Sequence, residues 1–162
     1  MSDNVYIIGS GMIRFNKYTE KNIKQMAAEA MGELIADMPL DKKDIEAAWF
    51  SNAGWGIYDG QHCIRGQVAL APIGIQGITI TNVENACAGG ATALHGAWTA
   101  VKAGLYDVAL AIGAEKIFTA TERQKMFDGF LSGTDVEFSR AIIEIFQAYA
   151  KKKAAEAGES GE

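Results

Sequence analysis

The stretch GITITNVENACAGGATALH, residues 77–95, is the most informative part of this chain of 162 residues. Its first part, Ile78 to Val83, reads as a strand, and the run from Ala88 to Ala103 has helical spacing. Cys87 falls at the junction. The first amides of a helix lack intrahelical partners and favour negative charge, and the thiolate is the reactive form of cysteine. Since free cysteines are also among the most buried residues, the position alone leaves open a nucleophile or an inert core residue.

The helix after Cys87 is part of an alternating pattern of strands and helices. One face of this helix carries Cys87, Ala91, Leu94, Trp98 and Val101, and Gly104 fits its left-handed cap. Further strands are predicted at Asn4 to Gly9, Ala47 to Ser51 and Val108 to Gly113. Further helices are predicted at Asn22 to Met38 (stopped by Pro39), Cys63 to Leu70 and Phe138 to Ala157, with an irregular stretch at Lys116 to Gly133. This order predicts an α/β fold with a mainly parallel sheet covered by helices.

Composition narrows the class of protein. Apolar residues make up 49% of the chain, so it has enough material for a core. The net charge is −5 and no stripe of Lys and Arg occurs, which argues against nucleic acid binding. No apolar stretch has membrane-spanning length, and the two cysteines have no metal-type partners around them. We therefore expect a cytoplasmic protein with reduced thiols, no metal and no membrane partner.

Other candidate site residues give weaker signals. His95 follows Cys87 by eight residues, about 12 Å along an ideal helix, so it is expected to be a packed helix residue rather than a base for the thiol. Adjacent His62 and Cys63 are expected to have a packing role, and Glu115 to be a turn or salt-bridge residue. Gly9-Ser-Gly11 follows a predicted strand, but Arg14 stands where a dinucleotide-binding loop needs a third glycine. No cofactor-binding residue is assigned.

Three segments resemble the thiolase superfamily. ENACAGGA, residues 84–91, resembles the nucleophile segment and is most like that of the sterol-carrier-protein-type thiolases. GQHCIRGQVA, residues 60–69, resembles the Gly-Gln-x-x-x-Arg stretch that precedes the nucleophile. VKAGLYDVALAIGAEK, residues 101–116, resembles the helix end, turn and strand that follow it. Each motif is loose alone, but their order and separations also agree, which makes the resemblance specific.

The resemblance implies a fold and an organisation. It implies the N-terminal half of the five-layered αβαβα thiolase fold, with an N-terminal α/β domain at 1–116. Residues 117–162 would begin the loop domain that binds coenzyme A and would be truncated. The family's C-terminal half, with a His, a second Cys and an Asn, has no counterpart here and is expected in cis or as a separate subunit. A homodimer is also implied, with the strand at 78–83 at its interface.

The resemblance also implies a chemistry. Cys87 would be the catalytic nucleophile, forming an acyl-cysteine intermediate from acyl-CoA substrates, with no covalently bound cofactor. The enzyme would cleave or form β-ketoacyl-CoA, and this chain alone would be inactive. Alternatives are a ketosynthase or hydroxymethylglutaryl-CoA synthase of the same superfamily, or a non-catalytic assembly subunit. Gly60-Gln61 and Glu84-Asn85 favour thiolase.

Overall fold

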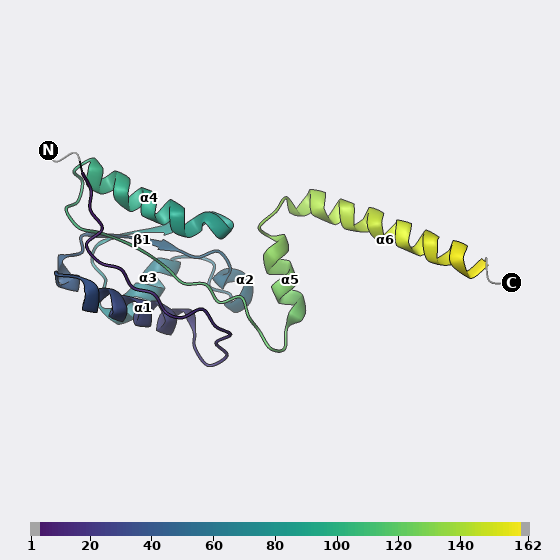
Figure 1. The fold of residues 1–162 in the computed structure, drawn as a ribbon, viewed down its shortest axis with the longest axis horizontal. Helices are drawn as coiled ribbons and strands as arrows, with labels where there is room; N and C mark the ends of the chain where they lie inside the picture. Colours follow the sequence, from purple (N-terminus) through teal and green to yellow (C-terminus); the bar gives the residue numbers. More distant parts are fainter. Residues whose placement is uncertain (1–3, 160–162) are drawn as a thin grey trace.

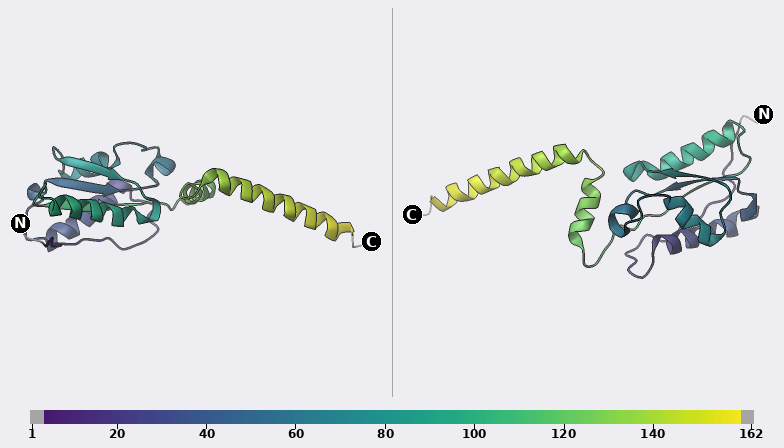
Figure 2. Two further views of the ribbon diagram at one scale, coloured as in Figure 1. Left: turned by 90° about the horizontal axis from the view of Figure 1, so that it is seen from above. Right: turned by 180° about the vertical axis from the view of Figure 1, so that it is seen from behind.

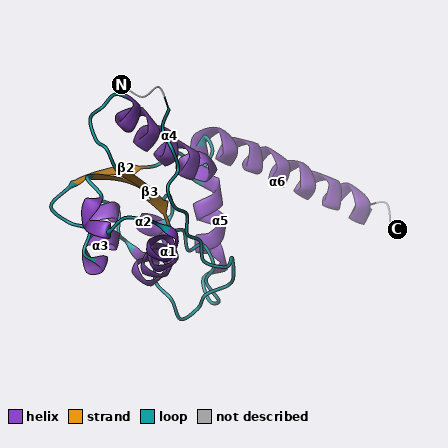
Figure 3. Cartoon of the chain, turned by 60° about the vertical axis from the view of Figure 1, so that its left-hand side comes forward, coloured by secondary structure: helices purple, strands orange, loops and turns teal. Residues whose placement is uncertain are grey.

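The centre of the protein is a three-stranded parallel sheet, seen in a computed structural model that describes residues 4–159. The strands are β1 (Ala47–Ser51), β2 (Thr79–Val83) and β3 (Ala109–Gly113), in the order β2-β1-β3. Ser51 pairs with Val83 on one side and with Gly113 on the other. The carboxyl ends of all three strands therefore meet at one edge (Figures 1 and 3).

Helices cover both faces of this sheet. The helix α4 (Gly89–Lys102) lies on one face, and α1 (Ile23–Asp37) and α3 (Arg65–Leu70) lie on the other (Figure 1). The short helix α2 (Trp55–Asp59) follows β1, and single 3-10 turns occupy Lys42–Asp44, Ala71–Ile73 and Ala86–Ala88. The predicted α/β fold with a parallel sheet covered by helices is confirmed.

The core lies between β1 and the helices α1 and α3. Its largest fully buried side chains are Phe50, Ile23, Met31 and Leu70. In β1, Ala47 and Ala48 point to opposite faces and are both fully buried. A central strand that is buried on both faces is what a parallel sheet with two helical layers requires.

The helix α4 packs on the sheet through small residues rather than through its large apolar ones. Its buried residues are Gly89, Ala93, Ala97 and Ala100. A Cβ added at Gly96 would stand only 2.5 Å from Nε1 of Trp49, so a larger residue would not fit there. Leu94 and Trp98, on the apolar face that the sequence suggests, are 50% and 47% exposed. The small residues of α4 face the sheet because they let the helix axis approach it closely.

The predicted strand from Asn4 to Gly9 is wrong. This segment pairs with none of the three strands, whose order is β2-β1-β3. It lies instead against α1: the Ser10 amide donates to Asp37 Oδ2 at 2.9 Å, and Gly9 packs against Met38. The segment, α1, α4 and β3 border an apolar groove of about 900 Å³. The segment is therefore attached to α1 at its end, through Gly9 and Ser10.

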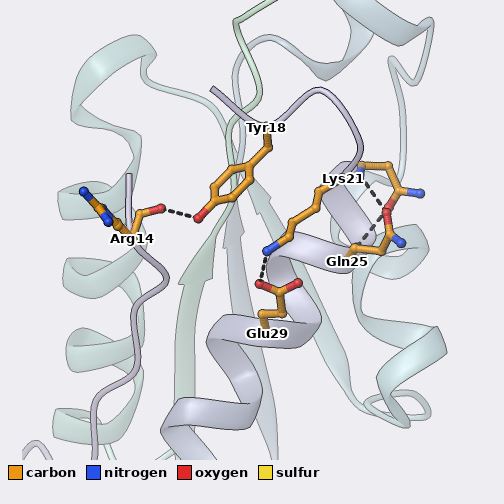
Figure 4. A network of polar contacts seen from close by, with 6 residues as sticks. Arg14, Tyr18, Lys21, Gln25 and Glu29 are labelled. Atoms are coloured by element: carbon orange, nitrogen blue, oxygen red, sulfur yellow. Dashed lines mark hydrogen bonds and ion pairs between the residues drawn. The ribbon is translucent and has the colours of Figure 1, made fainter. Parts of the chain in front are cut away.

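The start of α1 is held by polar contacts before its apolar face begins (Figure 4). Asn22 and Gln25 form a reciprocal capping box, with both bonds at 2.9 Å. Lys21 forms an ion pair with Glu29 at 2.7 Å and lies over the ring of Tyr18. The hydrogen bond to Glu29 raises the pKa of Lys21 above its ordinary value.

Two helices follow the sheet. The stretch predicted to be irregular contains α5 (Arg123–Leu131), which packs on α2. The predicted last helix is present as α6 (Val136–Glu159), which extends away from the sheet and its helices (Figures 1 and 2). Phe138, Phe146 and Tyr149 on α6 are more than half exposed. No helix among residues 4–159 is both long and apolar enough to cross a membrane.

Candidate active site

Cys87 lies where the chain passes from β2 into α4. β2 ends at Val83, the single turn Ala86–Ala88 follows, and α4 begins at Gly89. The Cys87 side chain is exposed and its thiol is free. The N-cap residue Ala88 supplies no side-chain hydrogen bond to the first amides of α4. The thiol therefore sits beside a helix N-terminus without a side-chain cap, at the carboxyl edge of the sheet, where the first amides of the helix lack intrahelical partners.

The turn that carries Cys87 has a strained backbone held by side chains. Ala86 has φ 44°, in the left-handed region that a residue with a Cβ seldom occupies. Its amide donates to Glu84 Oε1 at 2.6 Å. Asn85 Nδ2 donates to Thr92 Oγ1 at 2.9 Å, and that hydroxyl donates to the Ala88 carbonyl at 3.1 Å. The turn is thus tied both to itself and to the first turns of α4.

The strand β1 lies directly beneath this turn. A Cβ on Gly89 would collide with Ser51 Oγ, and a Cβ on Gly113 would stand 2.8 Å from the Ser51 carbonyl oxygen. The amide of Asn52 donates to the Val83 carbonyl at 3.2 Å, just before the turn begins. The first residue of α4 therefore rests on the end of β1, which explains why a glycine follows the cysteine so closely.

Asn52 is the centre of a hydrogen-bond network at this edge, and the sequence did not reveal it. It is the one buried polar residue among those described, 3% exposed. Its Nδ2 donates to the Ala114 carbonyl at 2.8 Å and to Glu115 Oε1 at 3.1 Å. Its Oδ1 accepts from the Trp55 amide at 3.0 Å and from Arg65 Nη1 at 3.2 Å. All four hydrogen-bonding positions of the amide are used.

Glu115 and Arg65 complete the network. The Glu115 carboxylate accepts from the amides of Ala53 at 2.7 Å and Gly54 at 3.1 Å, in addition to Asn52. Arg65 Nη1 also donates to the Ala53 carbonyl at 3.2 Å. Glu115 was predicted to be a turn or salt-bridge residue, but the structure shows it accepting hydrogen bonds from the loop after β1, 61 to 63 residues earlier in the chain. Arg65, the arginine of the Gly-Gln-x-x-x-Arg segment, joins the start of α3 to the loop after β1.

The remaining candidates lie apart from this network. His62 and Cys63 are exposed in the bend between α2 and α3, and His62 packs against Gly56. His95 is exposed on α4, with its ring centroid 5.9 Å from that of Trp98. Among residues 4–159, no group of three or more His, Cys, Asp and Glu side chains is placed to hold a metal ion.

A glycine of α5 and a second glycine just after this helix approach α2 and the Cys87 turn. Gly129 lies against the hydroxyl of Tyr58 on α2, where a Cβ would collide. Beyond the end of α5, a Cβ on Gly133 would stand 3.8 Å from that of Ala86, next to Cys87. Burial raises the pKa of Tyr58 above its ordinary value, and the nearby Glu115 carboxylate raises it further. This part of the molecule therefore carries an exposed thiol at Cys87 and a partly buried phenol at Tyr58.

Several known proteins are similar to this chain in sequence. An acetyl-CoA acetyltransferase from Methanocaldococcus jannaschii is 34% identical over 114 residues, covering 70% of this chain and 29% of that protein. Sterol carrier protein 2 from Gallus gallus is 35% identical over 120 residues, covering 72% and 21%. Benzoylsuccinyl-CoA thiolase subunit BbsB from Thauera aromatica is 33% identical over 113 residues, covering 68% and 28%. The chain thus spans less than a third of the length of these relatives.

A solved structure and a family model complete the comparison. The structure is 3-oxoacyl-[acyl-carrier-protein] synthase III from Aquifex aeolicus VF5, with a TM-score of 0.55 and 21% identity over 67% of this chain and 34% of that one. Identity this low bears on the fold alone. The family model of the thiolase N-terminal domain matches residues 5–160. This chain therefore belongs to the thiolase family.

Proposed function

We propose that Cys87 is the nucleophile of a thiolase-type acyl-CoA acyltransferase. The observation that carries this proposal is the exposed thiol at the uncapped N-terminus of α4, on a strained turn at the carboxyl edge of a parallel sheet. Thiolate character and access both make a cysteine reactive. Acetyl-CoA acetyltransferase and thiolase relatives support the reaction class.

The reaction would proceed in two covalent steps. The Cys87 thiolate attacks the carbonyl carbon of an acyl-CoA, the bond between that carbon and the sulfur of coenzyme A breaks, and the released thiolate takes up a proton. The acyl group is then held on Cys87 Sγ. In the second step, the deprotonated α-carbon of acetyl-CoA attacks this acyl carbon, a carbon–carbon bond forms and the Cys87 thiolate leaves. Covalent catalysis divides one difficult transfer into two easier ones.

The remaining groups for this chemistry are proposed to lie outside this chain. Removal of the α-proton needs a base, and the thiolase resemblance implies that acid and base residues come from a C-terminal half. That half would be joined in cis or supplied as a separate subunit. Residues 1–116 would form the N-terminal α/β domain, and residues 117–162 would begin the loop domain that binds coenzyme A. We therefore expect no turnover from this chain alone, and homodimerisation of the complete enzyme.

Alkylation of the two cysteines tests the nucleophile in this chain. Both thiols are exposed, so access alone does not favour either one. Iodoacetamide at neutral pH, followed by peptide mass spectrometry, should modify Cys87 at least about threefold faster than Cys63. The variant Cys63→Ser should leave the rate at Cys87 unchanged. Equal rates, or faster modification of Cys63, would contradict the assignment.

Acylation tests the reaction class in the complete enzyme. After incubation with acetyl-CoA, the wild-type protein should carry an acetyl group on Cys87, and Cys87→Ser should carry none while keeping its circular dichroism spectrum. An acetyl group that persists on another residue in Cys87→Ser would rule out the role given to this cysteine.

A further inference from the structure

We infer that Asn85 and Thr92 are positioning residues that hold the Cys87 turn in its reactive conformation. This inference rests on the proposed function of Cys87. Neither residue is offered as a group that touches substrate. Their role would be to keep a backbone conformation that the chain does not adopt easily without them.

The need for such a clamp comes from Ala86. Its φ of 44° places a residue with a Cβ in the left-handed region, at a cost that only surrounding contacts can offset. The residues on both sides of Cys87 are exposed, so packing in the core does not supply those contacts. The turn must be held by hydrogen bonds.

The hydroxyl of Thr92 joins the two ends of this turn. It accepts from Asn85 Nδ2 at 2.9 Å and donates to the Ala88 carbonyl at 3.1 Å. Asn85 immediately precedes Ala86, and Ala88 immediately follows Cys87. One hydroxyl therefore bridges the residues that flank the strained position and the thiol, and anchors them to the first turns of α4.

The Asn85–Thr92 clamp has a matched control on the same helix. Thr99 also donates its hydroxyl to a carbonyl four residues earlier, that of His95, at 2.8 Å. Thr99 is exposed and lies near the opposite end of α4 from Cys87. Replacing either threonine with valine keeps the branched shape and removes only the hydroxyl. The two substitutions therefore separate the loss of a helix back-bond from the loss of the clamp.

The test measures alkylation of Cys87 and Cys63 by iodoacetamide in the 162-residue chain. Thr92→Val should slow modification of Cys87 by roughly five- to tenfold and leave Cys63 unchanged. Thr92→Ser should restore most of the wild-type rate, and Thr99→Val should have no effect. Asn85→Ala should also slow Cys87, and adding Thr92→Val to it should cause less than the additive loss, because both remove the Asn85–Thr92 bond while Thr92→Val also removes the bond to the Ala88 carbonyl.

The possible outcomes distinguish failure of the Asn85–Thr92 clamp from failure of the proposed nucleophile. If Cys87 reacts no faster than Cys63 in the wild-type chain, the proposed function fails and the clamp has nothing to position. If Cys87 is fast and Thr92→Val leaves it fast, the clamp is refuted while the nucleophile stands. If Thr92→Ser slows Cys87 as much as Thr92→Val does, the hydroxyl is not responsible and the inference is overturned. If Thr92→Val slows Cys63 as much as Cys87, the substitution has loosened the protein generally, which also overturns the inference.

Discussion

Replacing Asn52 with aspartate changes the shape of the site very little but reverses the polarity of one of its atoms. Nδ2 is a donor to the Ala114 carbonyl and to Glu115 Oε1, at 2.8 and 3.1 Å. An oxygen in its place faces two acceptors, one of them a carboxylate. The bonds from the Trp55 amide and Arg65 to Oδ1 remain, and the one from Arg65 becomes an ion pair.

The expected loss of stability is about 3–4 kcal/mol. The lost hydrogen bond to the Ala114 carbonyl accounts for about 1 kcal/mol, because a retained proton still joins the two carboxyl groups. Two negative charges at the present 3.1 Å repel by about 5 kcal/mol with an effective dielectric constant of about 20. Keeping one carboxyl protonated at pH 7 costs about 4 kcal/mol and avoids this repulsion. The electrostatic contribution to the loss of stability is therefore at most about 4 kcal/mol. The stronger bond from Arg65 offsets about 1–2 kcal/mol.

The variant Asn52→Asp also predicts a pH dependence of known sign. In the folded variant one carboxyl keeps its proton, so its pKa is raised relative to the unfolded chain. The free energy of unfolding of the variant should therefore be highest below about pH 4 and should fall by about 1.4 kcal/mol per pH unit as the pH rises. The loss of stability relative to wild type should therefore be smaller near pH 4, where only the lost hydrogen bonding contributes, than at pH 7.

Urea denaturation followed by circular dichroism measures both effects. Asn16→Asp, on an exposed loop, is the matched control and should stay within about 0.5 kcal/mol of wild type. Adding Glu115→Gln to Asn52→Asp should recover part of the loss, because the new amide can donate to the introduced carboxylate. A loss below about 1 kcal/mol at pH 7, or a deficit independent of pH, would refute the reasoning.

Three further predictions concern other positions. Because burial and Glu115 raise the pKa of Tyr58, the folded state keeps that phenolic proton longer than the unfolded state, so stability should fall above about pH 10. Tyr58→Phe should weaken this alkaline loss in urea titrations at pH 9 to 11, and an unchanged slope would contradict it. Ile64 is exposed with φ 47°, so Ile64→Gly should raise stability by about 0.5–1 kcal/mol, and a lower melting temperature would contradict this. Thr81 is exposed on the edge strand β2, so Thr81→Lys should reduce self-association of the protein, measured by sedimentation, relative to the loop control Thr121→Lys. Equal self-association of the two variants would show that β2 is not an interface.

The structure alters how the edge strand β2 can be probed. Ile80 is half-buried and its Cγ2 would stand 2.8 Å from a Cβ on Gly66 of α3. Its carbonyl accepts from Gln67 Nε2 at 3.3 Å. A charge at Ile80 would therefore disturb packing within the chain as well as any contact between copies. Thr81 points away from α3, which makes it the cleaner position for the test.

The elements that the sequence predicted correctly are those with strong local signals. β1 was predicted with its observed bounds, and β2, β3, α1 and α4 within about two residues at each end. Pro39 and Gly104 mark helix ends through backbone conformation, which is a local property. The family resemblance was also readable, because its motifs are short segments whose residues and order lie in the sequence itself.

The candidate site could be predicted only in part. Cys87 stands out because its neighbours in sequence define the junction between strand and helix. Asn52 gave no such signal, since its importance comes from Ala114, Glu115 and Arg65, which lie 13 to 63 residues away along the chain. A buried hydrogen-bond centre is defined by its partners in space.

By itself, the sequence determined the α/β class, the main strands and helices, the thiolase family and the place of Cys87 before a helix. Only the tertiary structure decided that the segment from Asn4 to Gly9 lies against α1 instead of joining the sheet, and that α4 packs through alanine and glycine. Periodicity identifies an apolar face or an extended run, but not the surface that it will contact. That choice depends on which backbone groups and side chains from distant segments fit together most closely.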